Sequence, residues 1–127
     1  MVGNEFTILV VDDVSENLMI IERMLRHDGY QVKTAEDGRE ALRVLLKNEI
    51  DLAIVDINMP FMDGITLLKE IRSIDTLKFI PVIMLTALED KKTTMECMRH
   101  GASGYVTKPF DRKNLLLQID NCIAKPE

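Results

Sequence analysis

Acidic, hydroxyl and basic side chains stand at the ends of four apolar runs in this sequence. The run TILVV leads into Asp12 and Asp13, and DLAIV leads into Asp56. Thr86 follows VIML, and Lys108 follows GYVT. Carboxylate oxygens with no thiol or imidazole in the pattern favour Mg²⁺ over zinc, and a carboxylate, a metal ion, a lysine and a hydroxyl are sufficient for phosphoryl transfer. Asp56 is the predicted nucleophile, because carboxylates can form aspartyl phosphates.

These residues need a scaffold that brings their strand ends together. Uninterrupted apolar runs are typical of parallel strands buried on both faces, and segments with apolar residues at helical spacing separate them. Ser15 is the expected cap of the first helix, and Gly29 its expected end. The sequence predicts strands at 7–11, 31–34, 52–55, 81–85 and 104–107, and further helices at about 37–47, 65–73, 89–99 and 111–124.

Strict alternation of strands and helices predicts an α/β fold, because each right-handed crossover between parallel strands must be long enough to hold a helix. The expected architecture is a flavodoxin-like, doubly wound (βα)5 three-layer sandwich. Its parallel strand order, 2-1-3-4-5, is taken from known folds of this class rather than from the pattern itself. In that order Asp12, Asp13 and Asp56 converge at the switch point between the first and third strands. Three crowded carboxylates repel one another unless a cation compensates them, which again indicates Mg²⁺.

The composition limits the class of protein. A length of 127 residues fits one domain, expected to cover 1–127 with a core at about 6–124. The formal net charge of -5 argues against direct binding to nucleic acid. No secretory signal or membrane-spanning run is recognisable, and Cys97 and Cys122 lack the close-spaced companions of a zinc site. We therefore expect a reduced, cytoplasmic protein that does not enter a membrane.

Four segments, VVDD, VDINMPFMDG, PVIMLTA and GYVTKPF, together resemble the receiver domains of two-component response regulators. The resemblance covers nearly the whole chain, with the segments in the family's order and at its separations. It implies that Asp56 accepts a phosphoryl group, that Asp13 binds Mg²⁺ directly and that Asp12 does so largely through water. The backbone carbonyl of Asn58 is the implied third protein ligand.

The resemblance also assigns the residues around the phosphoryl group. Thr86 and Lys108 would contact it, and Ala87 would belong to the same cofactor-binding set. Lys108-Pro109 resembles the family's cis peptide, which is plausible because only X-Pro bonds adopt cis at low cost. Tyr105 falls at the family's switch aromatic. Thr86 would move toward the phosphoryl group and Tyr105 would turn inward, which would reshape the face made by the fourth helix, fifth strand and fifth helix.

The partners follow from the same resemblance. The phosphoryl donor would be a histidine kinase or a histidine phosphotransfer protein, and the signal would pass to a downstream output protein or a fused domain. The chain would catalyse its own phosphorylation and dephosphorylation without being a multiple-turnover enzyme. A phosphorylation-dependent homodimer is left open, and so is the choice between a stand-alone protein and a receiver that forms part of a larger regulator.

Three other functions share parts of this pattern. Asp56 and Asn58 loosely imitate the aspartate pair of haloacid-dehalogenase-like phosphatases, but that family carries its nucleophile on the first strand. A flavodoxin-like electron carrier would share the fold, yet no Ser/Thr-Gly-rich loop follows the first strand and the chain has no tryptophan to stack a flavin. A receiver that has lost phosphorylation is disfavoured because every chemical position is filled. His27, near the end of the first helix, is expected to favour the helix dipole rather than to carry a phosphoryl group.

Overall fold

Strands and helices alternate along the whole of the chain that the structure, a computed structural model, describes, namely residues 6–59, 62–87, 91–108 and 111–123. The strands are β1 (Thr7–Val11), β2 (Gln31–Ala35), β3 (Leu52–Asp56), β4 (Val82–Ala87) and β5 (Gly104–Lys108). The helices are α1 (Ser15–His27), α2 (Gly38–Lys47), α3 (Gly64–Ser73), α4 (Lys91–Arg99) and α5 (Arg112–Ile123). All strand pairs are parallel, and their order is β2-β1-β3-β4-β5. The predicted flavodoxin-like fold and strand order are confirmed.

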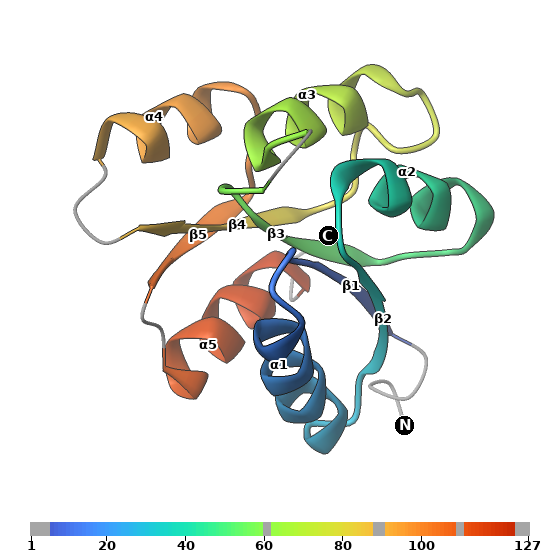
Figure 1. The fold of residues 1–127 in the computed structure, drawn as a ribbon, viewed down its shortest axis with the longest axis vertical. Coiled ribbons are helices and arrows are strands. Elements are labelled where there is room, and N and C mark those ends of the chain that lie inside the picture. Colours follow the sequence, from blue (N-terminus) through green and yellow to red (C-terminus); the bar gives the residue numbers. More distant parts are fainter. Residues whose placement is uncertain (1–5, 60–61, 88–90, 109–110, 124–127) are drawn as a thin grey trace.

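The sheet lies between two layers of helices (Figure 1). Helices α2, α3 and α4 cover one face, and α1 and α5 cover the other. Each face has its own hydrophobic cluster, one that includes Leu45, Leu67 and Cys97 and one that includes Ile21 and Ile119. Because both faces of the sheet are covered, its strands can be apolar along their full length.

Strand β3 shows why the central runs are uninterrupted. All five of its residues are buried. Ala53 and Val55 pack toward α2 and α3, whereas Leu52 and Ile54 pack toward α1 and α5. Successive side chains of a strand point to opposite faces, so a strand in the middle of a three-layer sandwich needs an apolar residue at every position. Only its last residue, Asp56, departs from this rule.

The helix ends agree with the sequence to within about one residue, except for the cap at the start of α1; the predicted start of the fourth helix at about 89 and end of the fifth at about 124 lie outside the described residues. Asp37 and Asp63 cap α2 and α3, each carboxylate accepting a backbone N–H three residues later at 2.8 Å. Gly29 follows the end of α1 with φ +96°, a conformation that favours glycine. The predicted capping role of Ser15 is wrong, because Ser15 is already the first helical residue and the N-cap is Val14, which makes no side-chain capping bond.

Four strands run slightly further than predicted: β2 ends at Ala35 rather than at Thr34, and the other three extend to include polar residues. Asp56, Thr86 and Lys108, expected just after their strands, lie within β3, β4 and β5. Their backbones continue the pairing of the ladder even though their side chains are polar, which is why the apolar pattern alone ended the strands too early. The functional side chains are therefore mounted on the sheet itself rather than on the loops that follow it.

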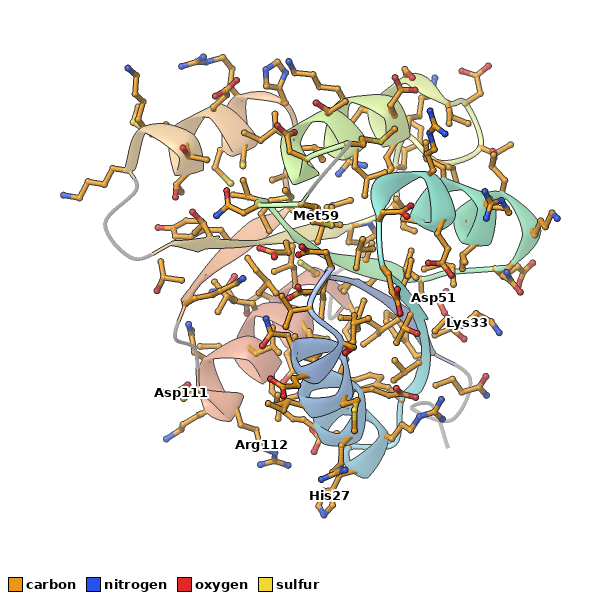
Figure 2. The ribbon with its side chains drawn as sticks, viewed as in Figure 1. His27, Lys33, Asp51, Met59, Asp111 and Arg112 are labelled. Carbon is orange, nitrogen blue, oxygen red and sulfur yellow. The ribbon has the colours of Figure 1, made fainter. Side chains whose placement is uncertain are left out.

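The described helices have two further features that bear on function. None of them is both long and apolar enough to cross a lipid bilayer. His27 lies in the last turn of α1, at the end of the helix far from the carboxyl ends of β1 and β3 (Figure 2). An exposed basic residue there is favourably placed toward the negative end of the helix dipole, as expected.

Candidate functional site

The carboxyl ends of β1 and β3 meet at the switch point of the sheet, where chain connections leave in opposite directions. Val11 of β1 pairs with Val55 of β3, so the residues that follow them, Asp12 and Asp56, come from neighbouring positions. One carboxylate oxygen from each of Asp12, Asp13 and Asp56 lies within 4.8 Å of the others. The structure thus brings together the three acids that follow the apolar runs of the sequence.

Asp12 is held firmly by neutral donors. Its side chain is fully buried, whereas Asp13 beside it is exposed. Oδ1 of Asp12 accepts a hydrogen bond from the backbone N–H of Val14 at 2.9 Å, and Oδ2 accepts one from Nδ2 of Asn17 at 3.2 Å. These bonds fix the carboxylate and leave its negative charge uncancelled, and a buried charge of this kind favours a nearby cation.

Asp56 is only 3% exposed and is contacted by a positive charge. Nζ of Lys108 lies 3.0 Å from Oδ1 of Asp56, and the backbone N–H of Asn58 donates to the same oxygen at 3.4 Å. Burial raises the pKa of the Asp56 carboxyl above its ordinary value, and the charge of Asp12 raises it further. Lys108 opposes both effects without overcoming them.

Lys108 reaches Asp56 across a strand. Its own strand, β5, pairs with β4, where Ala87 lies opposite Lys108, and β4 in turn pairs with β3. Neighbouring strands are about 4.8 Å apart, so the long lysine side chain must span roughly 10 Å of sheet. The ammonium group keeps part of its solvent exposure, with the side chain 32% exposed. It can therefore move to meet a group that arrives from solvent.

Thr86, at the end of β4, has an unsatisfied hydroxyl. The residue is 1% exposed, and its Oγ1 has no hydrogen-bond partner among the described residues. Buried polar atoms nearly always have a hydrogen-bond partner, and a buried hydroxyl without one indicates a bound water, an ion or a functional role. A hydroxyl on the strand between β3 and β5 is suited to donate to an oxygen atom held near Asp56.

The donor set fits a magnesium ion. Asp12, Asp13 and Asp56 supply carboxylate oxygens, and Mg²⁺ binds through one or two carboxylates while keeping several waters. Asp13 is exposed, so a hydrated ion has access from solvent. The single lysine contact to Asp56 leaves two carboxylate charges uncompensated in this cluster. A divalent cation would balance them.

Gly64 allows the loop after β3 to fold back onto the site. Its backbone N–H donates to the carbonyl of Ile57 at 2.8 Å. A Cβ at this position would lie 2.5 Å from the carbonyl oxygen of Asp56 and 2.7 Å from Cα of Ile57. Only glycine can approach the backbone this closely, so Gly64 helps to define the position of the Asp56 peptide.

Comparison with known proteins agrees with this geometry. The sequence matches the model of one protein family over residues 8–120, and that family is the response regulator receiver domain. The chain belongs to this family. Receiver domains of two-component response regulators are signalling modules, not classical enzymes, and they accept a phosphoryl group on an aspartate. They bind Mg²⁺ at an acidic pocket, and the aspartate cluster of this receiver domain corresponds to such a pocket.

Individual relatives of this receiver domain have different sizes. It is 38% identical over 126 residues to chemotaxis protein CheY-3 of Vibrio cholerae, and the match covers 98% of this chain and 97% of that protein. It is 37% identical over 124 residues to the transcriptional regulatory protein ZraR of Escherichia coli K12, with 98% of this chain and only 28% of ZraR covered. Receiver domains of this type therefore occur both nearly alone and as part of longer proteins.

Solved structures share the fold closely. A response regulator from Chloroflexus aurantiacus superposes with a TM-score of 0.91 at 37% identity, covering 94% of this chain and 98% of that one. The receiver domain of sensor histidine kinase PA1611 from Pseudomonas aeruginosa, with 32% identity, 94% and 98% coverage and a TM-score of 0.87, has a magnesium ion coordinated in its active-site cleft.

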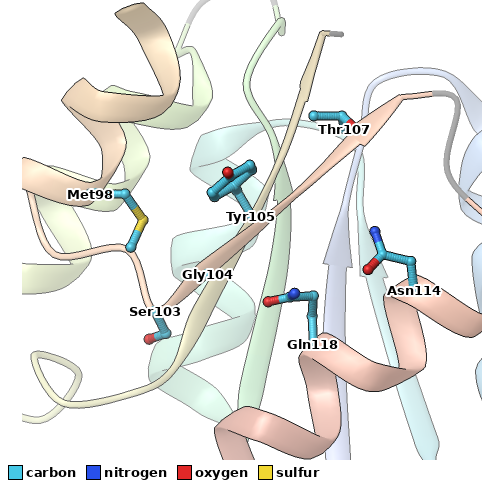
Figure 3. Close-up of a pocket in the computed structure, with 7 residues that line it drawn as sticks. All are labelled: Met98, Ser103, Gly104, Tyr105, Thr107, Asn114 and Gln118. Carbon is cyan, nitrogen blue, oxygen red and sulfur yellow. The ribbon is translucent and has the colours of Figure 1, made fainter. Parts of the chain in front are cut away.

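Of the residues expected to take part in switching, Tyr105 lies apart from the acid cluster. Tyr105 is 43% exposed and lines a pocket of about 410 Å³ between β5, α4 and α5 (Figure 3). Met98 from α4 and Gln118 from α5 flank this pocket. Pro109, expected to follow a cis peptide, lies outside the described residues.

One contact of the site was not anticipated by the sequence. The bond from Asn17 to Asp12 joins the first turn of α1 to the end of β1. The spacing of five residues from a strand-end aspartate into a following helix is the signal that predicts such a contact. It is a weak signal, because the path of the connecting residues decides whether the two side chains meet.

Proposed function

We propose that this receiver domain accepts a phosphoryl group on Asp56 from a histidine kinase or a histidine phosphotransfer protein, in a reaction that requires Mg²⁺. The observation that carries the proposal is the environment of the Asp56 carboxylate. It is buried, within 4.8 Å of the oxygens of Asp12 and Asp13, and 3.0 Å from the Lys108 ammonium. A buried carboxylate kept next to both acids and a cation is suited to phosphoryl transfer rather than to stabilising the fold.

The transfer itself is a displacement at phosphorus. Lys108 and Asn58 both contact Oδ1 of Asp56, so we assign Oδ2 as the attacking oxygen. A bond forms between this oxygen and phosphorus while the phosphorus–nitrogen bond of the donor histidine breaks, and the departing imidazole nitrogen takes a proton. Little covalent chemistry is asked of the protein, because positioning and charge neutralisation dominate such transfers.

The remaining site residues are proposed to hold the metal ion and the phosphoryl oxygens. Asp13 would bind Mg²⁺ directly, Asp12 largely through water, and Asn58 through its backbone carbonyl, together with Asp56. The metal supplies neutralisation of the charge that develops on the transferred group. Lys108 would contact a phosphoryl oxygen through its ammonium group.

The end of β4 would complete the phosphoryl site. The orphan hydroxyl of Thr86 would gain a partner on phosphorylation, and the backbone at Ala87, which pairs with Lys108, would lie beside the same group. The same residues would support the transfer of the phosphoryl group to water, so that the chain catalyses its own phosphorylation and dephosphorylation and is not a multiple-turnover enzyme.

The signal would leave through the face formed by α4, β5 and α5. Thr86 would move toward the phosphoryl group, and Tyr105, now 43% exposed, would turn inward. The pocket beside Tyr105 would then change shape, which biases the affinity of an output protein, a fused output domain or a second copy of the chain for this face. The partner is proposed to be a protein and not nucleic acid, since the chain carries a net charge of -5.

We further propose that residues 1–127 form a single receiver domain with a core at about 6–124. One hydrophobic cluster takes its helical residues from α2, α3 and α4 and the other from α1 and α5, and both include residues of the same sheet, so each described helix packs on one shared core layer. A cytoplasmic location is part of the proposal, because histidine kinases take their phosphoryl groups from cytoplasmic ATP.

Intact-mass measurement tests this function. The chain is incubated with a small acyl phosphate, with and without Mg²⁺, as wild type, as Asp56→Asn and as the control Asp75→Asn, whose carboxylate is exposed and distant from the site. We expect the mass of one phosphoryl group to be added to the wild type and to the control, only with Mg²⁺. Equal labelling of Asp56→Asn, or no labelling of the wild type, would contradict the proposal.

A further inference from the structure

Among the residues that the structure describes, Asn17 is the one whose side-chain amide bonds to the acid cluster. Its Nδ2 donates to Oδ2 of Asp12 at 3.2 Å, while Oδ1 of the same carboxylate accepts the backbone N–H of Val14 at 2.9 Å. Both carboxylate oxygens of Asp12 therefore accept a hydrogen bond, and the side chain is fully buried. These two bonds fix the direction in which the remaining lone pairs of Asp12 point, because each carboxylate oxygen can accept more than one bond.

Asp12 has no ion pair among the described residues, in contrast to Asp56. Lys108 contacts Asp56 directly at 3.0 Å. For Asp12, the charge must be balanced by something else, and its orientation is set by Asn17 and by one backbone group. A neutral donor suits this task, since it orients the carboxylate without competing with a metal ion for the role of counter-charge.

We infer that Asn17 is a positioning residue for Mg²⁺: it acts through Asp12, holding that carboxylate ready for the metal ion or its bound water. The inference rests on the proposed function in one respect, the binding of Mg²⁺ by the acid cluster. Mutation of a residue that hydrogen-bonds and orients a metal ligand typically lowers the metal affinity by about 10- to 100-fold. Because Asp12 is proposed to act largely through water, we expect the lower end of this range.

A purely structural role for Asn17 makes a different prediction. Asparagine is a weaker helix former than leucine, so α1 is not stabilised by the choice of asparagine at this position. Replacement by leucine, which has a similar size and no donor, removes one hydrogen bond from a buried carboxylate but adds a better helix former, so the urea midpoint of the metal-free chain should change little. A large loss of Mg²⁺ affinity with little change in stability would therefore separate positioning from folding.

The experiment is a titration of the unphosphorylated chain with Mg²⁺, followed by amide chemical shifts. Wild type is compared with Asn17→Leu, with Asn17→Gln, which keeps an amide donor, and with Asn48→Ala. Asn48 serves as the control, because its Nδ2 also donates one hydrogen bond, to the carbonyl of Val44 at 3.0 Å, but does so at the exposed C-terminal end of α2. We expect the Kd for Mg²⁺ to rise about tenfold in Asn17→Leu. The rise should be smaller in Asn17→Gln, and the Kd of the control should equal that of the wild type.

Several results would overturn the inference. A Kd within twofold of wild type in Asn17→Leu would show that Asp12 needs no positioning, and a tighter Kd would show that Asn17 competes with the metal. An equal loss in both Asn17 variants, accompanied by a lower urea midpoint, would assign a structural role instead. If the wild type bound no Mg²⁺, both this inference and the proposed Mg²⁺ site would be wrong. The other outcomes would overturn only the role of Asn17 and would leave the proposed phosphorylation of Asp56 standing.

Discussion

Replacement of Lys108 by methionine removes the one cation that contacts Asp56 among the described residues. Methionine keeps the length and apolar stem of lysine and loses only the ammonium group. Nζ lies 3.0 Å from Oδ1 of Asp56, whose side chain is 4% exposed. The variant therefore leaves a buried carboxylate near Asp12 and Asp13 with the backbone N–H of Asn58 as a donor but with no cation among the described residues.

The expected cost follows from Coulomb's law and from solvent exposure. Two unit charges 3.0 Å apart attract by about 5–6 kcal/mol at an effective dielectric constant of 20. The lysine side chain is 32% exposed, so water screens this attraction. The net contribution of the pair is also reduced by the free energy needed to desolvate the two charges. We expect Lys108→Met to lower the free energy of unfolding by about 1–3 kcal/mol at pH 7 in the absence of metal.

The cost should depend on pH in one direction. The folded-state pKa of Asp56 is raised by burial, so the stability that its neutral form provides is present below the unfolded value and is lost as pH rises through the folded pKa. Removing Lys108 deletes an interaction that lowers this pKa and moves it further up. The difference between variant and wild type should thus be largest near neutral pH and shrink in acid, where Asp56 is protonated in both.

Urea unfolding at several pH values between about 4 and 8, without Mg²⁺, measures this cost. The same measurement in an Asp56→Asn background completes a double-mutant cycle. In that background the cost of Lys108→Met should fall toward zero, and Asp56→Asn alone should stabilise the chain at neutral pH but not in acid. A cost that is independent of pH and unchanged in the Asp56→Asn background would refute the reasoning.

Three further predictions concern residues that hold loops and helix ends in place. Gly64→Ala should lower the free energy of unfolding by at least about 2 kcal/mol and slow phosphorylation, because its Cβ would meet the carbonyl oxygen of Asp56 at 2.5 Å; wild-type urea midpoint and labelling rate would show that the loop can move instead. Arg72→Met should lower the free energy of unfolding in urea by about 2–4 kcal/mol, because the half-buried guanidinium donates to the Gly101 carbonyl at 2.7 and 3.0 Å and to two carbonyls before β4. An unchanged midpoint would mean that water replaces these bonds. Asp63→Ala removes the cap of α3 and should cost about 1 kcal/mol in thermal unfolding, a value that Asp63→Asn should largely restore if capping is the cause.

The fold could be predicted because its pattern is local. Runs such as TILVV and LAIV are buried on both faces, and the helices between them show an apolar stripe, so each element follows from its own residues. The convergence of Asp12 and Asp56 required the strand order as well, which was taken from known folds and not from the pattern. The ends of the strands were predicted too early because hydrophobicity stops at Asp56, Thr86 and Lys108 while the backbone ladder continues.

The details of the site depend on geometry that the pattern does not contain. Ser15 looks like a helix cap, yet the chain turns one residue earlier and the Asp12 carboxylate takes the N–H of Val14. The contact of Asn17 with Asp12 and the orphan hydroxyl of Thr86 depend on side-chain directions at the ends of β1 and β4. The exposure of Tyr105 likewise depends on how α4 packs beside β5, and no sequence period encodes that packing.

The central claim is that Asp56 carries the phosphoryl group, and its location can be measured directly. The chain is phosphorylated with a small acyl phosphate and Mg²⁺. The aspartyl phosphate formed on the protein is then reduced with borohydride, and the modified residue is identified by peptide mass mapping. The account predicts modification at Asp56 alone in the wild type. Modification at Asp12 or Asp13 instead, or spread over several acids, would contradict it.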